Sequence, residues 1–331
     1  MRTRPPELDD KQVAAALAAG WRLAVDALAY APVGFGSHHW RVTAGGDRWF
    51  ATVDDLAAKR WRADEPLSGP RERLVAALTT ARLLRDGGLD FVVAPVATGG
   101  GDVLVPLGDR WAMALYPHVD GRPHTWGRYP DRAARLAVVD LVARLHRAPA
   151  TAWAGARPDG LVLPHRDGLE AALAGAAGPG GPGPYAAPAH DLVARHAGAV
   201  RAALARYDRL VALVRARPDR RVLTHGEPHR ANTITTPAGP VLIDWETALV
   251  AAPERDLWSL AAEDDRTLGD YAERTGTVPD PDALALYRLA WDLSEVAGYR
   301  AVFHRPHRDT EDARQAWDGL RGYLEVVASG R

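Results

Sequence analysis

The sequence predicts an α+β protein in which a small first part holds an antiparallel sheet and a larger second part is mainly helical. Two observations support this prediction. Segments whose apolar residues alternate as in strands lie almost entirely before residue 117, and segments with helical spacing fill most of the chain after it. A length of 331 residues is enough for two units with a core each. We therefore expect one unit at 1–116 and another at 117–331.

The composition excludes several classes of protein. The chain has no cysteine, so disulfides, zinc–thiolate sites and thiol nucleophiles are ruled out. Its net charge of −1 does not suit a protein that neutralises many nucleic-acid phosphates, and no apolar run approaches the roughly 20 residues of a membrane span. The first residues lack the pattern of a secretory signal. We expect a cytoplasmic protein, monomeric or dimeric, that binds neither nucleic acid nor membranes.

The first unit is expected to begin with a helix over 9–29, where apolar residues recur at helical spacing behind a capping aspartate. The period then changes to that of strands, and residues 31–42 and 45–53 predict a hairpin that turns at a glycine pair. A second helix over 69–86 begins near a proline and ends before two glycines. Further strands are expected at 91–97, 102–107 and 110–116.

The second unit is expected to be built from helices. A helical pattern runs from 131 to 147. The stretch 174–188 contains too much glycine and proline for regular structure, so we expect an exposed loop there. Further helical patterns lie at 189–216, 253–275, 281–303 and 308–329.

The residues that indicate chemistry are concentrated between Thr224 and Trp258. The first part reads Thr-His-Gly-Glu-Pro-His-Arg-Ala-Asn and places Glu227 five residues before Asn232. An apolar stretch, Val-Leu-Ile, then leads to Asp244. Such a loop can hold an acid near a substrate hydroxyl while the amide side chain and the aspartate bind a divalent ion, as phosphoryl transfer requires. Either part alone is explained by a turn, whereas the two at this spacing indicate a functional site.

Two hydrolytic alternatives have less support. The chain contains no Gly-x-Ser-x-Gly elbow, which a serine hydrolase of the α/β type would need. His225 and His229 have the i, i+4 spacing of a metal-binding pair. Pro228 between them argues against the helix that would present both rings to one ion.

The segment resembles the His-Gly-Asp-x-x-x-x-Asn loop and the following metal aspartate of aminoglycoside phosphotransferases and related kinases. The continuation Ala-Pro-Glu-Arg-Asp-Leu-Trp also resembles this family, and Gly-Glu-Pro-His is most similar to its spectinomycin-phosphotransferase-like branch. The resemblance implies a bilobal protein-kinase-like fold, with ATP or GTP as phosphoryl donor and Mg²⁺ as the ion. It also implies that Asn232 and Asp244 bind Mg²⁺ and that Glu227 orients or deprotonates the acceptor hydroxyl.

Earlier positions match the family in their order along the chain. The residues that resemble a short glycine loop over the nucleotide phosphates are Gly34, Gly36 and Ser37. The residues that resemble the hinge bonded to the adenine edge are Leu115, Tyr116 and His118. The resemblance therefore implies that these two groups bind the nucleotide.

One departure from the family pattern concerns the phosphate-binding lysine. The family places a lysine on the strand after the glycine loop, where this chain has Thr52. We expect Lys59 to reach the phosphates instead, and Glu72 on the following helix is its candidate partner. Arg60 or Arg62 could do the same work.

The second departure is Glu227, which stands where the family has an aspartate. The extra methylene moves the carboxylate by about an ångström, and such a misplacement can cost ~100-fold in rate unless the loop compensates. A glutamate base is nevertheless chemically reasonable, because phosphoryl transfer depends mainly on positioning and charge neutralisation. Together the two departures leave open a degenerate kinase that binds nucleotide without turnover.

Acidic residues in the second unit predict a cationic acceptor, because carboxylates that line a cleft attract amines. These acids are Glu246, Asp256, Asp292 and Glu295, with a further acidic run at 263–265. Aromatic residues that could line a pocket for a ring are Trp258, Tyr287, Trp291 and Tyr299. We expect phosphorylation of a hydroxyl on a small polar molecule such as an aminocyclitol or aminoglycoside antibiotic. An amino alcohol or sugar metabolite is the alternative.

Overall fold

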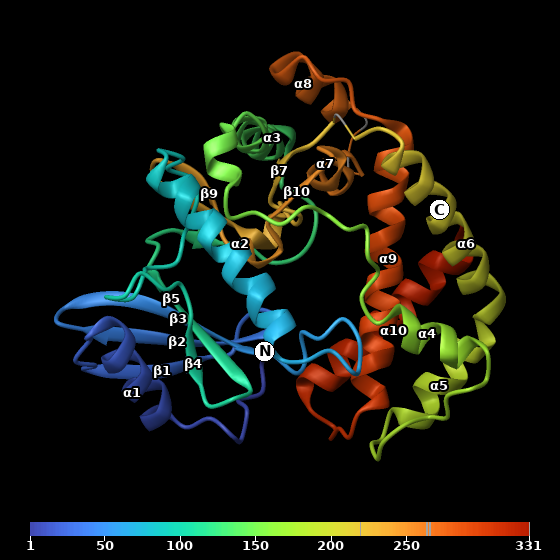
Figure 1. The fold of residues 1–331 in the computed structure, drawn as a ribbon, viewed down its shortest axis with the longest axis horizontal. Helices are drawn as coiled ribbons and strands as arrows, with labels where there is room; N and C mark the ends of the chain where they lie inside the picture. The colour runs from blue at the N-terminus through green and yellow to red at the C-terminus, as the bar shows by residue number, and fades with distance from the viewer. Residues whose placement is uncertain (219, 263, 265, 331) are drawn as a thin grey trace.

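The computed structural model describes residues 1–218, 220–262, 264 and 266–330, which form a small sheet-containing lobe and a larger helical lobe (Figure 1). The small lobe is a five-stranded antiparallel sheet in the order β1-β2-β3-β5-β4. Its strands span Ala27–Ala31 (β1), Ser37–Ala44 (β2), Asp47–Asp55 (β3), Val105–Leu107 (β4) and Trp111–Pro117 (β5). The predicted α+β fold class is confirmed.

One helix covers each face of this sheet. Successive side chains of β5 alternate, so Met113 and Leu115 pack with α1 (Asp10–Trp21). Ala112 and Ala114 face the other way and pack with α2 (Ser68–Asp86). The predicted hairpin is present, because Gly45 and Gly46 turn the chain between β2 and β3 with φ of +60° and +84°.

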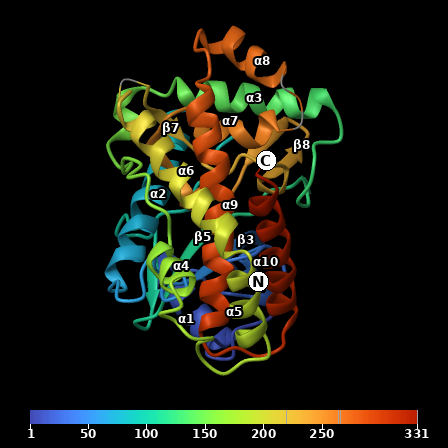
Figure 2. The same ribbon diagram turned by 90° about the vertical axis from the view of Figure 1, so that its right-hand side faces the viewer.

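The large lobe is organised around α9 (Pro281–His304), the long helix in the centre of Figure 2. Five helices pack against it, α4 (Arg166–Leu173), α5 (Ala186–Arg195), α6 (Ala197–Arg215), α7 (Glu254–Ala261) and α10 (Glu311–Ser329). Leu286, Leu293 and Val296 of α9 are fully buried among them. At the end of this lobe, α3 (Arg132–His146) packs against α8 (Arg266–Thr275).

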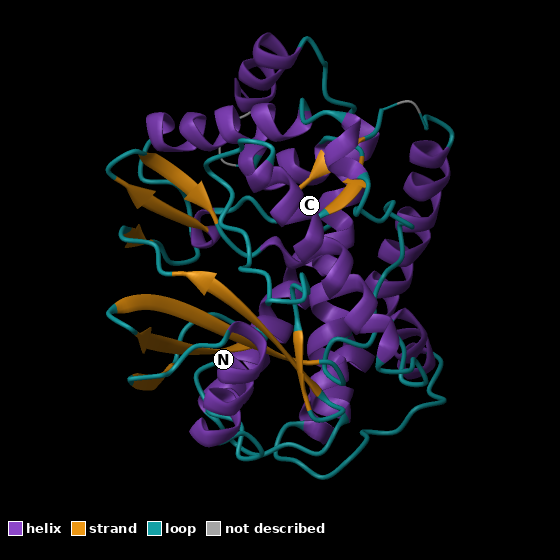
Figure 3. Ribbon diagram, turned by 60° about the vertical axis from the view of Figure 1, so that its left-hand side comes forward, coloured by secondary structure: helices purple, strands orange, loops and turns teal. Residues whose placement is uncertain are grey.

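Short strands in the large lobe carry the motif segments and lie apart from the main sheet (Figure 3). One pair joins β7 (Val222–Thr224) to β10 (Leu249–Ala251). A second sheet joins β6 (Arg122–Pro123), β8 (Thr233–Thr236) and β9 (Gly239–Leu242). Three short 3-10 helices follow the chain at Ala150–Trp153 (η1), Arg230–Asn232 (η2) and Trp245–Thr247 (η3).

Several predicted elements are wrong in extent. The first helix does not continue to residue 29, because Arg22 adopts a left-handed conformation and residues 27–31 pair with β2 instead. Residues 91–97 form no strand beyond an isolated bridge between Val92 and Leu242. The predicted strand at 102–107 is reduced to β4, and neither α4 nor the two small sheets were predicted. β6 pairs with β8 and β7 pairs with β10, in each case across a long stretch of sequence, so local patterns do not reveal these two pairings.

Among the described residues, no helix is both long and apolar enough to cross a membrane.

The packing around α9 predicts a large effect of a core truncation. Leu293→Ala should lower the free energy of unfolding by about 2–5 kcal/mol, because a fully buried leucine loses its contacts and leaves a cavity. Urea denaturation followed by circular dichroism measures this change. Val278→Ala, at a side chain that is 78% exposed, is the control and should change stability little. Equal effects of the two substitutions would contradict the proposed core.

Candidate functional site

The predicted catalytic loop begins after β7, which ends at Thr224. Asp256 of α7 binds the backbone of this loop. The backbone N–H groups of His225 and Gly226 donate to the two carboxylate oxygens of Asp256, at 2.9 and 2.5 Å. His146 at the end of α3 lies 3.1 Å from the same carboxylate through Nε2, and its Nδ1 lies 2.7 Å from the hydroxyl of Tyr271. These contacts are buried, so they fix where the loop begins.

Asp256 is therefore an anchor of the loop. Its side chain is 0% exposed and its oxygens are occupied by the loop amides and His146, which is inconsistent with the expected contact to substrate. Burial acts to raise the pKa of Asp256, but the hydrogen bond and charge of His146 outweigh it, and the pKa lies below its ordinary value. The carboxylate is thus ionised in the folded protein at neutral pH.

Gly226 is required where the loop turns. Its φ is +98°, and a Cβ there would lie 2.5 Å from the guanidinium of Arg255. That guanidinium cannot move freely, because it donates to the Thr224 hydroxyl at 2.9 Å and to the Thr247 carbonyl at 2.8 Å. The His-Gly pair of the motif consequently has a structural reason in this fold.

A hydrogen bond between Asn232 and Glu227 closes the loop. The side-chain amide of Asn232 donates to the backbone carbonyl of Glu227 at 3.0 Å. The Glu227 carboxylate lies 3.5 Å from Nε2 of His229 and its side chain is 29% exposed. Burial acts to raise the pKa of Glu227, but the interaction with His229 lowers it below its ordinary value. A carboxylate that is ionised and partly exposed suits the base that the sequence predicts.

Asp244 lies beside this loop, just after β9. The N–H of Ile243 donates to the Asn232 carbonyl at 3.0 Å, and the Ile243 carbonyl lies 2.9 Å from Nε2 of His225. Asp244 itself has φ 65° and ψ 62°, a left-handed conformation that is uncommon outside glycine. The structure therefore brings the predicted metal ligands Asn232 and Asp244 to adjacent segments.

The charges around Asp244 suit a divalent cation. The residue is exposed, yet the surrounding protein and the carboxylates of Glu246 and Glu227 raise its pKa well above the ordinary value. Asn232 uses its amide nitrogen within the loop, which leaves its side-chain oxygen for an ion. The described residues contain no group of three or more His, Asp or Glu side chains placed around one ion. Two protein oxygens supplemented by water and phosphate are typical of Mg²⁺.

Lys59 reaches the segment after Asp244 from the turn after β3. Its ammonium lies 3.2 Å from Asp54 and 2.5 Å from Glu246, and its side chain is 18% exposed. Burial acts to lower the pKa of Lys59, but Asp54 and Glu246 raise it above the ordinary value. Glu72 is exposed on α2 and is not the partner, so that expectation is wrong.

Thr52, at the position of the family lysine, and Arg62, an alternative to Lys59, have partners different from those of Lys59. Thr52 lies 3.2 Å from His39 within the sheet, through its hydroxyl. Arg62 is 63% exposed and pairs with Asp64 and Asp167. Glu246, expected to contact substrate, is instead bonded to Lys59.

The predicted glycine loop connects β1 to β2. Gly34 and Gly36 have φ of +71° and +92°, so this tight turn depends on glycine. The Ser37 hydroxyl donates to Asp54 at 2.5 Å and is buried, which ties the end of the loop to the neighbour of Lys59. At the tip, the ring of Phe35 lies 5.9 Å from that of Tyr299 on α9. The tip of the loop thus contacts the large lobe.

The predicted hinge is the end of β5 and the residues after it. The Leu115 carbonyl accepts from the Val96 N–H at 2.7 Å, and the His118 N–H donates to the Arg48 carbonyl at 3.2 Å. Tyr116 faces the α2 side of the sheet and is partly buried. β4 pairs only with residues 111–113 of β5, so the hinge begins where that pairing stops.

Acidic and aromatic side chains of α9 line the other side of the catalytic loop. Burial raises the pKa of Asp292 to about 6 and, together with Glu227 and Asp292, that of Glu295 to about 7. The Trp291 ring stacks on Trp126 at 5.8 Å with an interplanar angle of 11°. Trp126 is 59% exposed.

Other aromatic residues separate into two groups. Trp258 lies 5.6 Å from Trp291, centroid to centroid, and so belongs to the same cluster. Tyr287 is buried and donates to Asp159 at 3.0 Å, so it does not line the pocket as expected.

Sequence reasoning missed two residues of this cluster. The His229 ring lies 4.4 Å from that of Trp126 and its Nδ1 is buried without a hydrogen-bond partner among the described residues. Its position two residues after Glu227 was a signal that could have identified it. Trp126 lies in an irregular segment and carried no such signal.

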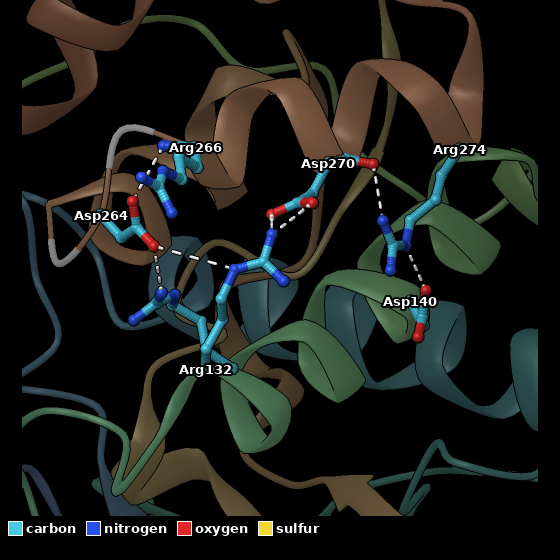
Figure 4. Close-up of polar contacts among 7 residues, drawn as sticks. Arg132, Asp140, Asp264, Arg266, Asp270 and Arg274 are labelled. Carbon is cyan, nitrogen blue, oxygen red and sulfur yellow. Dashed lines mark hydrogen bonds and ion pairs between the residues drawn. The ribbon is translucent and has the colours of Figure 1, made fainter.

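Asp264, the described residue of the acidic run at 263–265, takes part in ion pairs away from the site. Glu263 and Asp265 lie outside the described residues. Asp264 pairs with Arg135 at 2.8 Å, and Figure 4 shows it within a group of ion pairs between α3 and α8. In the same group Arg132 pairs with Asp270 at 2.7 Å. Asp264 and Asp270 therefore bind arginines of α3 and join this helix to α8 and the residues before it.

Comparisons with known proteins agree with this architecture. A model of the phosphotransferase enzyme family (APH) matches residues 30–287. Protein StrN of Streptomyces griseus is 31% identical over 254 residues, which cover 73% of this chain and 74% of StrN. The structure of spectinomycin phosphotransferase in complex with ADP and spectinomycin has a TM-score of 0.71 at 14% identity, covering 97% of this chain and 98% of its own.

Two further solved structures share the fold. Amicoumacin kinase, in complex with AMP-PNP and Ca²⁺, has a TM-score of 0.62 at 13% identity over 98% of this chain and 94% of its own. The microcompartment-associated aminopropanol kinase has a TM-score of 0.60 at 15% identity over 96% of both chains. The expected bilobal kinase-like fold is confirmed.

The anchoring role of Asp256 predicts a large, pH-dependent effect of its removal. Asp256→Asn should lower the free energy of unfolding by about 3 kcal/mol at pH 7, because an amide cannot accept all the hydrogen bonds of a buried carboxylate. The folded-state pKa is depressed, so this stabilisation is present above the unfolded pKa of about 3.9 and is lost as the pH falls through the lower folded value. Denaturant titrations across pH measure the difference.

The control for this experiment is Asp318→Asn, on a side chain that is 76% exposed on α10. It should leave stability nearly unchanged at every pH. A difference between wild type and Asp256→Asn that persists undiminished in strong acid would contradict the anchoring role.

Proposed function

The chain belongs to the phosphotransferase enzyme family, and from that premise we propose that it transfers the γ-phosphoryl group of ATP to a hydroxyl of a small cationic ring compound. Asn232 and Asp244 would hold Mg²⁺, which neutralises charge on the phosphates when it is bound. Glu227 would accept the proton of the attacking hydroxyl.

One observation carries this proposal. A partly exposed, ionised Glu227 and the Asn232–Asp244 pair lie on adjacent segments, and Lys59 bonds to Glu246, two residues beyond Asp244. Phosphoryl transfer needs this set, because an acceptor base, a divalent ion and fixed cations must surround one phosphoryl group. The presence of Lys59 in the cleft favours an active enzyme over a degenerate nucleotide-binding protein.

The donor and the ion have indirect support. The neighbouring structures of spectinomycin phosphotransferase and amicoumacin kinase contain ADP and AMP-PNP, the latter with Ca²⁺. This chain has a glycine loop that ends near Lys59. It also has a cluster of carboxylates whose mutual repulsion a cation would reduce. We therefore favour ATP with Mg²⁺.

The acceptor site combines acids with aromatic faces. Asp292 and Glu295 attract an ammonium group, and Trp126 and Trp291 offer ring faces on which a saturated ring or its ammonium can pack. An aminocyclitol or aminoglycoside antibiotic has both features. An amino alcohol is the second candidate, because the two carboxylates would also bind a short alkylammonium, and one structural neighbour is an aminopropanol kinase.

Incubation of the protein with Mg²⁺, ATP and single compounds tests the function. The panel contains aminoglycosides, aminocyclitols, amino alcohols and neutral sugars, and mass spectrometry detects a product heavier by one phosphoryl group. We expect phosphorylation of an amine-bearing ring compound. Asp244→Asn should reduce turnover by more than ~100-fold, since the charge of the ion ligand is lost. Phosphorylation of no compound, together with no binding of MgATP, would refute the kinase assignment.

The acceptor site also predicts a pH dependence. Because the pKa of Glu295 is raised to about 7, this side chain is mostly neutral below pH 7 and charged above it. The KM for a cationic acceptor should therefore rise severalfold as the pH falls from 8 to 6, since the attraction is lost. Steady-state kinetics with a fixed saturating ATP concentration measure it. In Glu295→Gln the KM should be high throughout and much less dependent on pH.

A further inference from the structure

The strand that normally carries a phosphate-binding lysine has no cation at the cleft in this chain. The basic residue of β3 is Arg48, which pairs with Asp120 at 2.5 Å and is 55% exposed. Thr52, the position that matches the family lysine, is engaged with His39. The charge that faces the phosphates must come from elsewhere.

A turn at the end of β3 supplies it. The N–H groups of Ala58 and Lys59 both donate to the Asp55 carbonyl, at 3.0 and 3.1 Å, so the chain folds back over one turn. Arg73 of α2 then donates to the Lys59 carbonyl at 2.8 Å and stacks over the Trp61 ring at 4.1 Å. α2 thus contacts the backbone of Lys59 through Arg73, whereas Glu72 of the same helix is exposed.

Two carboxylates from different lobes hold the Lys59 ammonium. Asp54, whose side chain is 3% exposed, lies 3.2 Å away and also accepts from the hydroxyl of Ser37 at the end of the glycine loop. Glu246 lies 2.5 Å away and is two residues beyond Asp244. Trp245 between them is fully buried and donates to the Leu242 carbonyl at 2.9 Å, which limits movement of this segment. Lys59 therefore joins the glycine loop to the predicted ion-binding segment.

We propose that Glu246 is a positioning residue that, with Asp54, holds Lys59 against the nucleotide phosphates, and that this pair between the lobes replaces the usual strand lysine and its helix glutamate. The inference rests on the proposed function. It assigns Glu246 to the nucleotide side of the cleft and away from the acceptor. It also explains why Lys59 is one of only two lysines in a chain that otherwise uses arginine, since a compact ammonium fits between two carboxylates.

Isothermal titration of the full-length protein with MgADP and with adenosine tests the role of Lys59. Lys59→Ala should weaken MgADP binding roughly tenfold or more, because a charge-assisted contact is lost, and leave adenosine binding within about twofold. Lys59→Arg should retain part of the MgADP affinity. Equal weakening of MgADP and adenosine would show general damage to the site and overturn the proposal.

A double-mutant cycle tests the role of Glu246. Glu246→Gln should weaken MgADP binding severalfold in the wild-type background but have little further effect in Lys59→Ala, because it acts through the ammonium. The KM for the acceptor should stay within about twofold. Additive effects, or an acceptor KM that changes while MgADP binding does not, would overturn the proposal. Glu72→Gln, the same substitution on exposed α2, is the matched control and should change neither quantity.

These experiments separate the inference from the function on which it rests. A wild-type protein that binds no MgADP contradicts the proposed function itself. A wild-type protein that binds MgADP and phosphorylates an acceptor, with a fully active Lys59→Ala variant of unchanged MgADP affinity, contradicts only the role of Lys59. Circular dichroism melting of each variant identifies any loss of fold.

Discussion

The position of the catalytic loop depends on one buried carboxylate. Asp256 is shielded from water, and a charge in such a place is tolerated only if hydrogen bonds satisfy it. Its partners are two consecutive backbone amides of the loop and His146 of α3. Because one carboxylate accepts from all of them, the loop, α3 and α7 are held in one arrangement. The direction in which Glu227 leaves the backbone follows from this contact, which lies outside the cleft.

The cleft above this anchor contains more acids than cations. Asp54, Asp244 and Glu246 lie near a single ammonium, and burial, together with repulsion from neighbouring carboxylates, raises the pKa of Asp244 and Glu246. Binding of a divalent ion would reduce the repulsion between these carboxylates. A cation close to these carboxylates would lower their pKa values and favour their charged forms, so the site favours nucleotide as its complex with an ion. Glu227 differs from these acids, because His229 lowers its pKa and keeps it ionised, as the proposed role of base requires.

α9 belongs to both the core and the site. Leu286, Leu293 and Val296 are packed among the helices of the large lobe, whereas Trp291 and Glu295 are oriented toward the catalytic loop and Trp126. A helix held on several sides by other helices cannot easily shift, so the face of α9 that carries the proposed acceptor site is rigid. The side of the site that faces α9 is formed by loops. One of them is the glycine loop, whose Phe35 contacts Tyr299. Differences among acceptors would therefore be accommodated mainly by those loops.

Local patterns in the sequence were sufficient for much of this description. The glycine pair of the hairpin, the long amphipathic helices and the spacing from Glu227 to Asn232 follow from contacts between residues close in the chain, and the structure contains each of them. Periodicity also identified α9 as one helix carrying Asp292 and Glu295. The extent of the first helix was not predictable in this way, because residues 27–31 gain their hydrogen bonds from β2.

Contacts between distant segments were decided only by the tertiary structure. Lys59 meets Glu246 across 187 residues of sequence, and Asp256 points inward to the loop although its sequence position suited a substrate contact equally well. Trp126 acquires its place through ring contacts with Trp291 of α9 and with His229. The sequence by itself determined the chemical groups and their local spacing. Which carboxylate serves as anchor, which holds the lysine and which faces the acceptor depends on how the two lobes pack, because a charge takes its role from its surroundings.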